Sequence, residues 1–235
     1  MSTSPRFLLI LISIIASACG ERAATPPGAT SAPAEQAAAP VEIQIVAEEV
    51  SYEAGGAALK GYLAYDAART GARPGVLIVH EWWGHNDYVR DRARMLAEMG
   101  YTAFALDMYG DGKLATHPED AQKFAMEVMN NMQAGTERFE AAMKLLQDHE
   151  STDPQKIAAI GYCFGGAVVL HMARSGMELD GVASFHGSLG TASPAAPGAI
   201  KARILVAHGA DDPFVPQAEV DAFKAEMQAA GADLT

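Results

Sequence analysis

The stretch Ile157–Ala173 constrains the fold more than any other part of the chain. A short apolar run, Ile157–Ile160, meets the segment Gly161–Gly166, and an apolar, helix-compatible run, Ala167–Ala173, follows. This order predicts a strand, a sharp turn and a helix, with Cys163 at the apex. It has the form of the nucleophile elbow G-x-S-x-G, with Cys in place of Ser. The glycines two positions on either side fit a strained apex that packs too closely for a Cβ atom.

Cys163 has two interpretations at this stage. A thiol at the N-terminus of a helix is favoured to ionise, because the helix dipole stabilises the thiolate, and an attacking cysteine needs that environment. A buried free cysteine beside glycines at a tight turn is also common in cores that carry no chemistry. Features elsewhere in the sequence are needed to distinguish a catalytic cysteine from a structural one.

Strand and helix patterns alternate from Val41 onward. Partial alternation predicts an antiparallel pair at a sheet edge, over Val41–Tyr52 and Leu59–Tyr65. Continuous apolar runs predict buried strands over Gly75–His80, Tyr101–Leu106, Gly181–Phe185 and Ile204–Ala207. Helical spacing predicts a helix from Asn86 or Asp87 to Gly100, two helices separated at Gly135 between residues 121 and 146, and one over 217–230. The pattern indicates a doubly wound, mostly parallel α/β sheet, whose sites lie outside the carboxyl ends of the strands.

Composition narrows the class of protein further. The chain has 235 residues, of which 49% are hydrophobic and 20% charged, and this indicates one globular domain with an appendage. The formal net charge is −12 without a Lys/Arg cluster, which argues against nucleic acid and anionic lipid as partners. The two cysteines, Cys19 and Cys163, imply no disulfide framework.

The pattern of residues at the N-terminus predicts that the protein is exported. Residues 1–19 have the pattern of a signal peptide, in which Arg6 is the basic residue and small residues precede Cys19. The apolar run between them, Phe7–Ala18, has 12 residues and is too short for a membrane span. This resembles a bacterial lipoprotein signal with Cys19 as the acylated residue, and it also fits ordinary cleavage with release into the periplasm. Residues 20–40 are rich in Ala, Pro, Ser and Thr and predict a flexible linker, so the folded domain spans 41–235.

Polar residues follow several of the predicted strands. His80–Gly84 and Asp107–Lys113 come after two of them, and the loop Gly209–Pro216 follows a strand downstream of the elbow, where the acid of a nucleophile–acid–histidine order is expected. The run His80–His85 is H-E-x-x-x-H at a strand end and not H-E-x-x-H on a helix, so it does not predict a zinc site. Gly110–Lys113 does not match a phosphate-binding loop, and neither a metal nor a cofactor is expected.

Three segments follow one another along the chain: the H-E-x-x-G segment His80–Gly84, the cysteine elbow Gly161–Gly166 and the loop Gly209–Pro216. With these segments in this order, the region Val41–Thr235 resembles the dienelactone hydrolases of the α/β-hydrolase superfamily. The resemblance implies an α/β-hydrolase fold. It also implies hydrolysis of a small-molecule ester or lactone without a cofactor.

The resemblance also implies residue roles. Cys163 forms a thioester-type acyl-enzyme, and Asp212 is the acid, because G-x-x-D-x-x-V is the usual form of the family's loop. Glu81 lies near the thiol and controls its ionisation, so that the thiolate appears when substrate displaces the carboxylate. The backbone N–H groups of Trp82 and Phe164 form the oxyanion hole. The candidate pocket residues are Trp83, Tyr109, Lys113 and His186.

The chain departs from the family pattern in two places. The family's catalytic histidine lies one strand beyond the helix predicted over 217–230, whereas no histidine follows His208 here. The triad histidine is therefore absent from this chain, and we expect a fold that lacks its C-terminal strand and helix, with weak activity and an exposed sheet edge. The loop Asp107–Lys113 lacks the arginine that well-known members use for the substrate carboxylate, and Lys113 is a candidate substitute.

Two functions from different classes remain open. The first is an exported, cysteine-dependent ester or lactone hydrolase, with a membrane contact only through a lipid on Cys19. The second is an α/β-hydrolase-like protein that binds a ligand without turnover, an alternative that the missing histidine supports. The sequence does not indicate an oligomeric state.

Overall fold

The computed structural model describes residues 42–235, so the predicted signal peptide, Cys19 and the predicted linker lie outside the described residues. In chain order the elements are β1 (Ile45–Ala54), β2 (Ala57–Asp66), β3 (Arg73–Val79), α1 (Asp87–Glu98), β4 (Thr102–Leu106), α2 (Pro118–Met129), α3 (Met132–Asp148), β5 (Thr152–Tyr162), α4 (Phe164–Arg174), β6 (Gly181–Phe185), β7 (Arg203–Ala207) and α5 (Gln217–Ala230). No helix in the described part is both long and apolar enough to cross a membrane.

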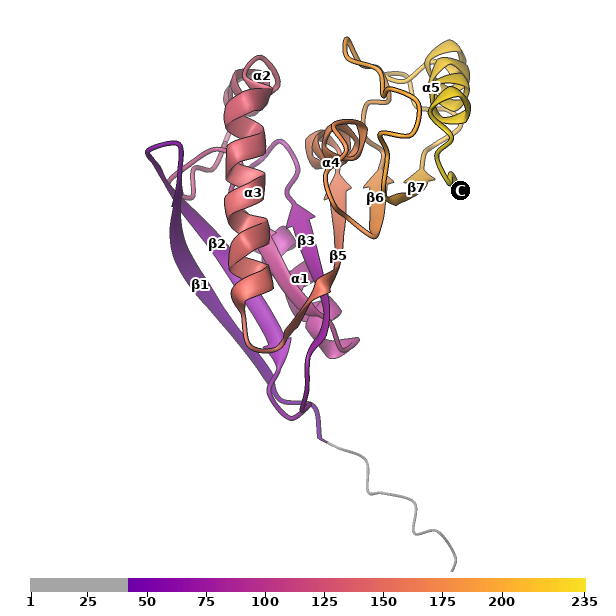
Figure 1. Ribbon diagram of the computed structural model, residues 1–235. Helices are drawn as coiled ribbons and strands as arrows, with labels where there is room; N and C mark the ends of the chain where they lie inside the picture. Colours follow the sequence, from indigo (N-terminus) through magenta and orange to yellow (C-terminus); the bar gives the residue numbers. More distant parts are fainter. Residues whose placement is uncertain (1–41) are drawn as a thin grey trace, which may run out of the picture. The chain divides into compact units, whose positions relative to one another are not determined.

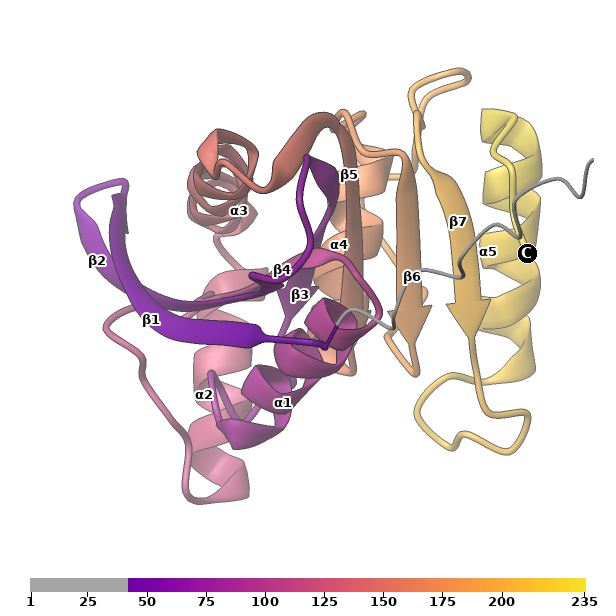
Figure 2. The same cartoon turned by 90° about the horizontal axis from the view of Figure 1, so that it is seen from below.

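The seven strands form one sheet in the order β1-β2-β4-β3-β5-β6-β7 (Figures 1 and 2). β1 pairs antiparallel with β2, and β2 pairs antiparallel with β4. The remaining neighbours are all parallel. The predicted edge hairpin and the predicted mostly parallel sheet are therefore both confirmed. Because β3 to β7 run in the same direction, their carboxyl ends meet at one edge of the sheet.

Helices cover both faces of the sheet, as a doubly wound fold requires. On one face α1 packs its buried residues Val89, Ala93 and Ala97 on β2, β3 and β4. On the other face α3 and α4 pack on the central strands, and α2 and α5 extend the same core (Figure 1). The central strand β4 is buried along its whole length, which explains why it reads as a continuous apolar run.

The break between α2 and α3 was predicted at Gly135, and this prediction is wrong. α2 ends at Met129, and the Asn131 side chain caps α3 by accepting a hydrogen bond from the Ala134 N–H (3.3 Å). Gly135 lies inside α3, where a Cβ atom would come within 3.3 Å of Val128 Cγ1. Gly135 therefore allows α3 to pack closely against Val128. The break between the helices lies at Asn131, whose side chain caps the start of α3.

The C-terminal residues of the chain lie along the edge strand β7. The chain end pairs with β7, since the Ile204 N–H donates to the Asp233 carbonyl (2.7 Å) and the Val206 N–H to the Thr235 carbonyl (3.0 Å). On one face of β5, β6 and β7 an open, mostly apolar hollow of about 450 Å³ is lined by residues that include Ile160 and Leu205. Beside β7 the chain end forms one isolated parallel bridge, between Leu234 and Ile204.

Candidate active site

Cys163 sits at the apex of the predicted elbow, between the end of β5 and the start of α4. Its backbone has φ 55° and ψ −116°, a conformation that non-glycine residues seldom adopt. A Cβ atom on Gly161 would lie 2.0 Å from the Gly165 carbonyl oxygen, and one on Gly165 would lie 2.4 Å from the carbonyl oxygen of Val79. Both glycines are therefore required by close backbone approach, which is the physical reason that the sequence predicted.

The half-buried thiol of Cys163 faces two backbone donors and two carboxylates. Burial raises the pKa of the thiol above its ordinary value, and the charges of Glu81 and Asp212 raise it further. The nearby backbone N–H groups of Phe164 and Trp82 lower this pKa, but they do not offset the other effects. The resting thiol is consequently protonated, although the helix N-terminus was expected to favour the thiolate.

Glu81 connects the thiol to a neighbouring strand. Glu81 is the second residue after β3, and its Oε1 atom lies 3.5 Å from Nε2 of His186, the residue that follows β6. The Glu81 side chain is 27% exposed and that of His186 is 50% exposed, so both are reachable from solvent. The carboxylate therefore stands between an ionisable thiol and an ionisable imidazole.

The backbone that carries the Trp82 N–H is held by two buried side chains. His80 Nε2 accepts a hydrogen bond from the Met108 N–H (3.2 Å), so Nδ1 carries the proton and donates to the Glu81 carbonyl (2.6 Å). The Tyr109 hydroxyl donates to the Trp82 carbonyl (3.0 Å). The loop after β4 thus fixes the direction of the Trp82 peptide group. Sequence reasoning missed this role of His80 and Tyr109, because the partners lie at the ends of different strands.

The burial of His80 leads us to expect that the stability of the protein depends on pH. Burial lowers the pKa of His80 to about 4, from 6.5 in an exposed histidine. Between these values the unfolded chain binds a proton that the folded chain does not, so the free energy of unfolding decreases as pH falls. The shift corresponds to about 3 kcal/mol.

We expect urea unfolding at pH 7 and pH 4 to show this loss, and we expect His80→Gln to reduce it. The glutamine can still donate and accept hydrogen bonds, but it does not titrate. The exposed His117, changed to Gln, is the matched control and should leave the loss intact. Equal losses in the His80→Gln variant and the unchanged protein would contradict the prediction.

Asp212 lies in the predicted loop after β7. Its Oδ1 atom accepts the Phe214 N–H (2.9 Å), and the buried Val215 anchors the loop to the core. The charge of Asp212 acts on the thiol, whereas Asp211 is exposed. Asp212, rather than Asp211, is therefore the aspartate of this loop whose charge raises the pKa of the thiol.

The four candidate pocket residues do not share one cavity. Tyr109 and Lys113 line a polar cavity of about 250 Å³ between α2 and α3, together with Arg138. The Lys113 ammonium lies 4.8 Å from the centre of the Phe124 ring, a cation–π contact. Trp83 packs edge-on against Trp82, with ring centroids 5.3 Å apart, and His186 pairs with Glu81.

Comparison with known proteins agrees with the geometry. The sequence model of the dienelactone hydrolase family matches residues 59–235. A protein of Aquifex aeolicus named putative carboxymethylenebutenolidase is 32% identical over 143 residues, which cover 59% of this chain and 60% of that protein. "Protein usf" of Aquifex pyrophilus has the same identity and coverage. The match thus spans about 60% of the length of these curated relatives.

Two solved structures share both the fold and part of the sequence. The structure named m3DLH superimposes with a TM-score of 0.76 and is 36% identical, covering 81% of this chain and 80% of that one. A dienelactone hydrolase-like promiscuous phosphotriesterase from metagenomic libraries has a TM-score of 0.74 and 33% identity, with the same coverage. These similarities extend over nearly all of the described residues.

Proposed function

Since the chain belongs to the dienelactone hydrolase family, we propose that it hydrolyses a small-molecule ester or lactone through an acyl-enzyme on Cys163. One observation carries the proposal. Cys163 sits on a strained apex, and the backbone N–H groups of Phe164 and Trp82 lie close enough to its sulfur to lower the pKa of the thiol. Two such donors beside a nucleophile are what an acyl-transfer site needs to stabilise an oxyanion.

The proposed first step forms a thioester. The thiol proton passes to Glu81, the carboxylate with the larger effect on the thiol, and the sulfur attacks the carbonyl carbon. The new C–S bond leaves negative charge on the carbonyl oxygen, which Phe164 and Trp82 stabilise through their N–H groups. The C–O bond then breaks, and the leaving alkoxide takes the proton from Glu81. Water hydrolyses the thioester in a second step, which releases the acid and restores the thiol.

The protonated resting thiol supports this order of events. Burial and the two carboxylates raise the pKa of Cys163, so the free enzyme carries little thiolate. A substrate that binds beside the thiol aligns its carbonyl with the two N–H groups, and the thiol proton passes to Glu81 as the sulfur attacks. Activation would then depend on substrate, which also protects the cysteine from oxidation between turnovers.

Trapping the acyl-enzyme tests the proposal. We expect p-nitrophenyl acetate, incubated with the full chain and quenched in acid within seconds, to leave an acetyl group on the peptide that contains Cys163. Neutral hydroxylamine should remove this group, because thioesters are cleaved under conditions that spare amides. The adduct accumulates when deacylation is slower than acylation.

The same experiment separates the two candidate functions. Release of p-nitrophenolate without acetylation of Cys163, unchanged when that thiol is blocked beforehand, would refute the cysteine mechanism. Saturable ligand binding with neither release nor acetylation would favour a non-catalytic binding protein. The peptide that contains Cys19 serves as the internal control, because acetylation there reports only general thiol reactivity.

A further inference from the structure

The backbone of His186 is strained in the same sense as that of Cys163. Its φ is 44°, and the non-glycine residues with positive φ in residues 42–235 are Asp111, Cys163 and His186. Such conformations persist only where the surrounding structure maintains them, and they are frequent at functional sites. One of the three is the candidate nucleophile, and His186 immediately follows the strand beside it.

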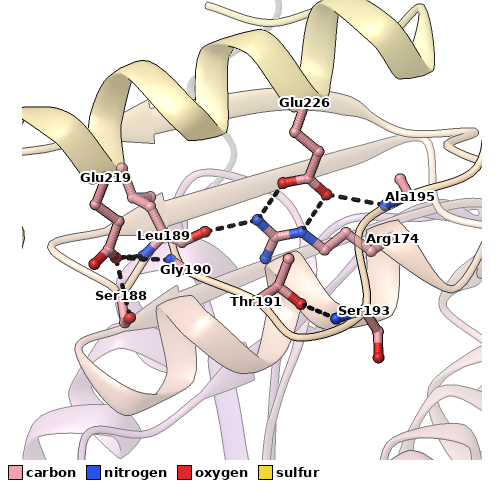
Figure 3. Close-up of polar contacts among 9 residues, drawn as sticks. All are labelled: Arg174, Ser188, Leu189, Gly190, Thr191, Ser193, Ala195, Glu219 and Glu226. Carbon is pink, nitrogen blue, oxygen red and sulfur yellow. Dashed lines mark hydrogen bonds and ion pairs between the residues drawn. The ribbon is translucent and has the colours of Figure 1, made fainter.

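The segment that carries His186 is held on several sides. The His186 N–H donates to the last carbonyl of β7 (2.8 Å), and the neighbouring Phe185 carbonyl accepts the N–H of Cys163 (2.9 Å). Beyond it, the Glu219 carboxylate of α5 accepts the two N–H groups of Leu189–Gly190 at 2.8 and 2.7 Å (Figure 3). These bonds hold the backbone that carries His186, and the imidazole of His186 approaches Glu81.

We propose that His186 is a positioning residue for Glu81, an inference that rests on the proposed function and deepens it. The imidazole holds the Glu81 carboxylate and shares its charge, and thereby sets how readily Cys163 reacts. The observation is the 3.5 Å approach of His186 Nε2 to Glu81 Oε1, made from a strained backbone on the adjacent strand. A protonated imidazole reduces the negative potential that Glu81 exerts on the sulfur.

Other ionisable groups also face this cluster. Asp212 acts on the thiol, and the thiol acts on Tyr109. The charge of Glu81 also reaches Tyr162. The two tyrosines have pKa values raised by burial, so they stay neutral over the range in which a histidine titrates. Asp212 is present in all of the variants described below, so it does not alter the comparison.

Alkylation of Cys163 by iodoacetamide between pH 5 and pH 10 tests the role without relying on turnover. Mass spectrometry of the peptide that contains Cys163 separates this reaction from alkylation of Cys19. We expect His186→Asn to slow alkylation about threefold near pH 6, equivalent to half a pKa unit at the thiol. The difference should shrink as pH rises, because a neutral imidazole has no charge to set against that of Glu81. Asparagine is the chosen substitute because it tolerates positive φ.

A double-mutant cycle with Glu81→Gln identifies the route of the effect. If His186 acts through Glu81, then His186→Asn has no effect on the alkylation profile in the Glu81→Gln background. The same slowing in both backgrounds, or a His186→Asn profile that overlays that of the unchanged protein, would overturn the proposal. The exposed His117, changed to Asn, is the control and should leave the profile unchanged.

The outcome is separable from that of the proposed function. Ester hydrolysis is measured on the same preparations. Coupling between His186 and Glu81 without hydrolysis would refute the hydrolase and keep the positioning role. Hydrolysis through Cys163 without coupling would refute the positioning role and keep the hydrolase. Thermal unfolding of each variant establishes that the compared proteins are folded.

Discussion

Replacing Cys163 by Ala is expected to lower ester hydrolysis by at least about 10³-fold, because comparable nucleophile deletions remove the covalent route and leave only the oxyanion hole and substrate binding. The alanine has no atom that can attack the carbonyl, whereas the N–H groups of Phe164 and Trp82 remain in place. The steady-state kcat/KM for p-nitrophenyl acetate measures the effect. Any activity that remains reports what the backbone donors contribute alone.

Two comparisons sharpen this result. Cys19→Ser changes the chain's other cysteine and should leave kcat/KM unchanged, which assigns the chemistry to one thiol. Cys163→Ser keeps a nucleophilic atom but replaces a thiol by a hydroxyl of much higher pKa, so it should also be strongly impaired without a strong base. Hydrolysis that survives in Cys163→Ala at the original rate would show that the reaction does not proceed through the elbow.

The second large effect concerns stability. Replacing Glu226 by Leu is expected to lower the free energy of unfolding by about 3–5 kcal/mol, because it leaves the buried Arg174 charge without its partner. Arg174 donates from Nε to Glu226 Oε1 (2.9 Å) and from Nη2 to Oε2 (2.8 Å), with side chains only 5% and 11% exposed (Figure 3). Urea unfolding at pH 7 provides the measurement.

The contacts around this pair explain why the loss is large. Arg174 Nη2 also donates to the Leu189 carbonyl (2.7 Å), and Glu226 Oε1 accepts the Ala195 N–H (3.0 Å). The pair therefore connects α4 and α5 to the loop between β6 and β7. Burial opposes ionisation of Glu226, but the hydrogen bonds from Arg174 and Ala195 outweigh it, and the pKa of Glu226 lies below its ordinary 4.5. This stabilisation is present above pH 4.5 and is lost as pH falls through the lowered pKa.

Two further variants distinguish a lost partner from lost packing. The double variant Arg174→Met with Glu226→Leu removes both charges and should recover much of the stability, because no buried charge is left unpaired. Lys144→Ala breaks the pair with Asp148, whose side chains are 74% and 63% exposed, and should cost less than about 1 kcal/mol. A double variant as unstable as Glu226→Leu would contradict the electrostatic explanation.

Much of the fold was predictable because its signals are local. The residues of β6 and α5 were predicted with the observed bounds, since apolar runs and helical spacing depend on neighbours in the sequence. The break at Asn131, by contrast, was misplaced at Gly135. A glycine in a helical pattern can end a helix or admit a close neighbour, and only the packing of Val128 against it shows which applies.

The candidate site divides in the same way. The elbow with Cys163, the acid loop with Asp212 and the segment with Glu81 could be placed from sequence, because each follows a recognisable strand and parallel strands end at one edge. The anchoring of the Trp82 peptide by His80 and Tyr109 could not. Neither could the pairing of Tyr109 and Lys113 in one cavity while Trp83 lies elsewhere.

The sequence by itself determined the succession of strands and helices along the chain and the need for glycine around a strained cysteine, because periodicity and backbone conformation are properties of short segments. The tertiary structure alone decided which side chains meet. Glu81 and His186 are 105 positions apart, and they meet because the sheet places β5 between β3 and β6. The order of the strands within the sheet is set by the packing of the whole domain, so contacts of this kind cannot be derived from any local pattern.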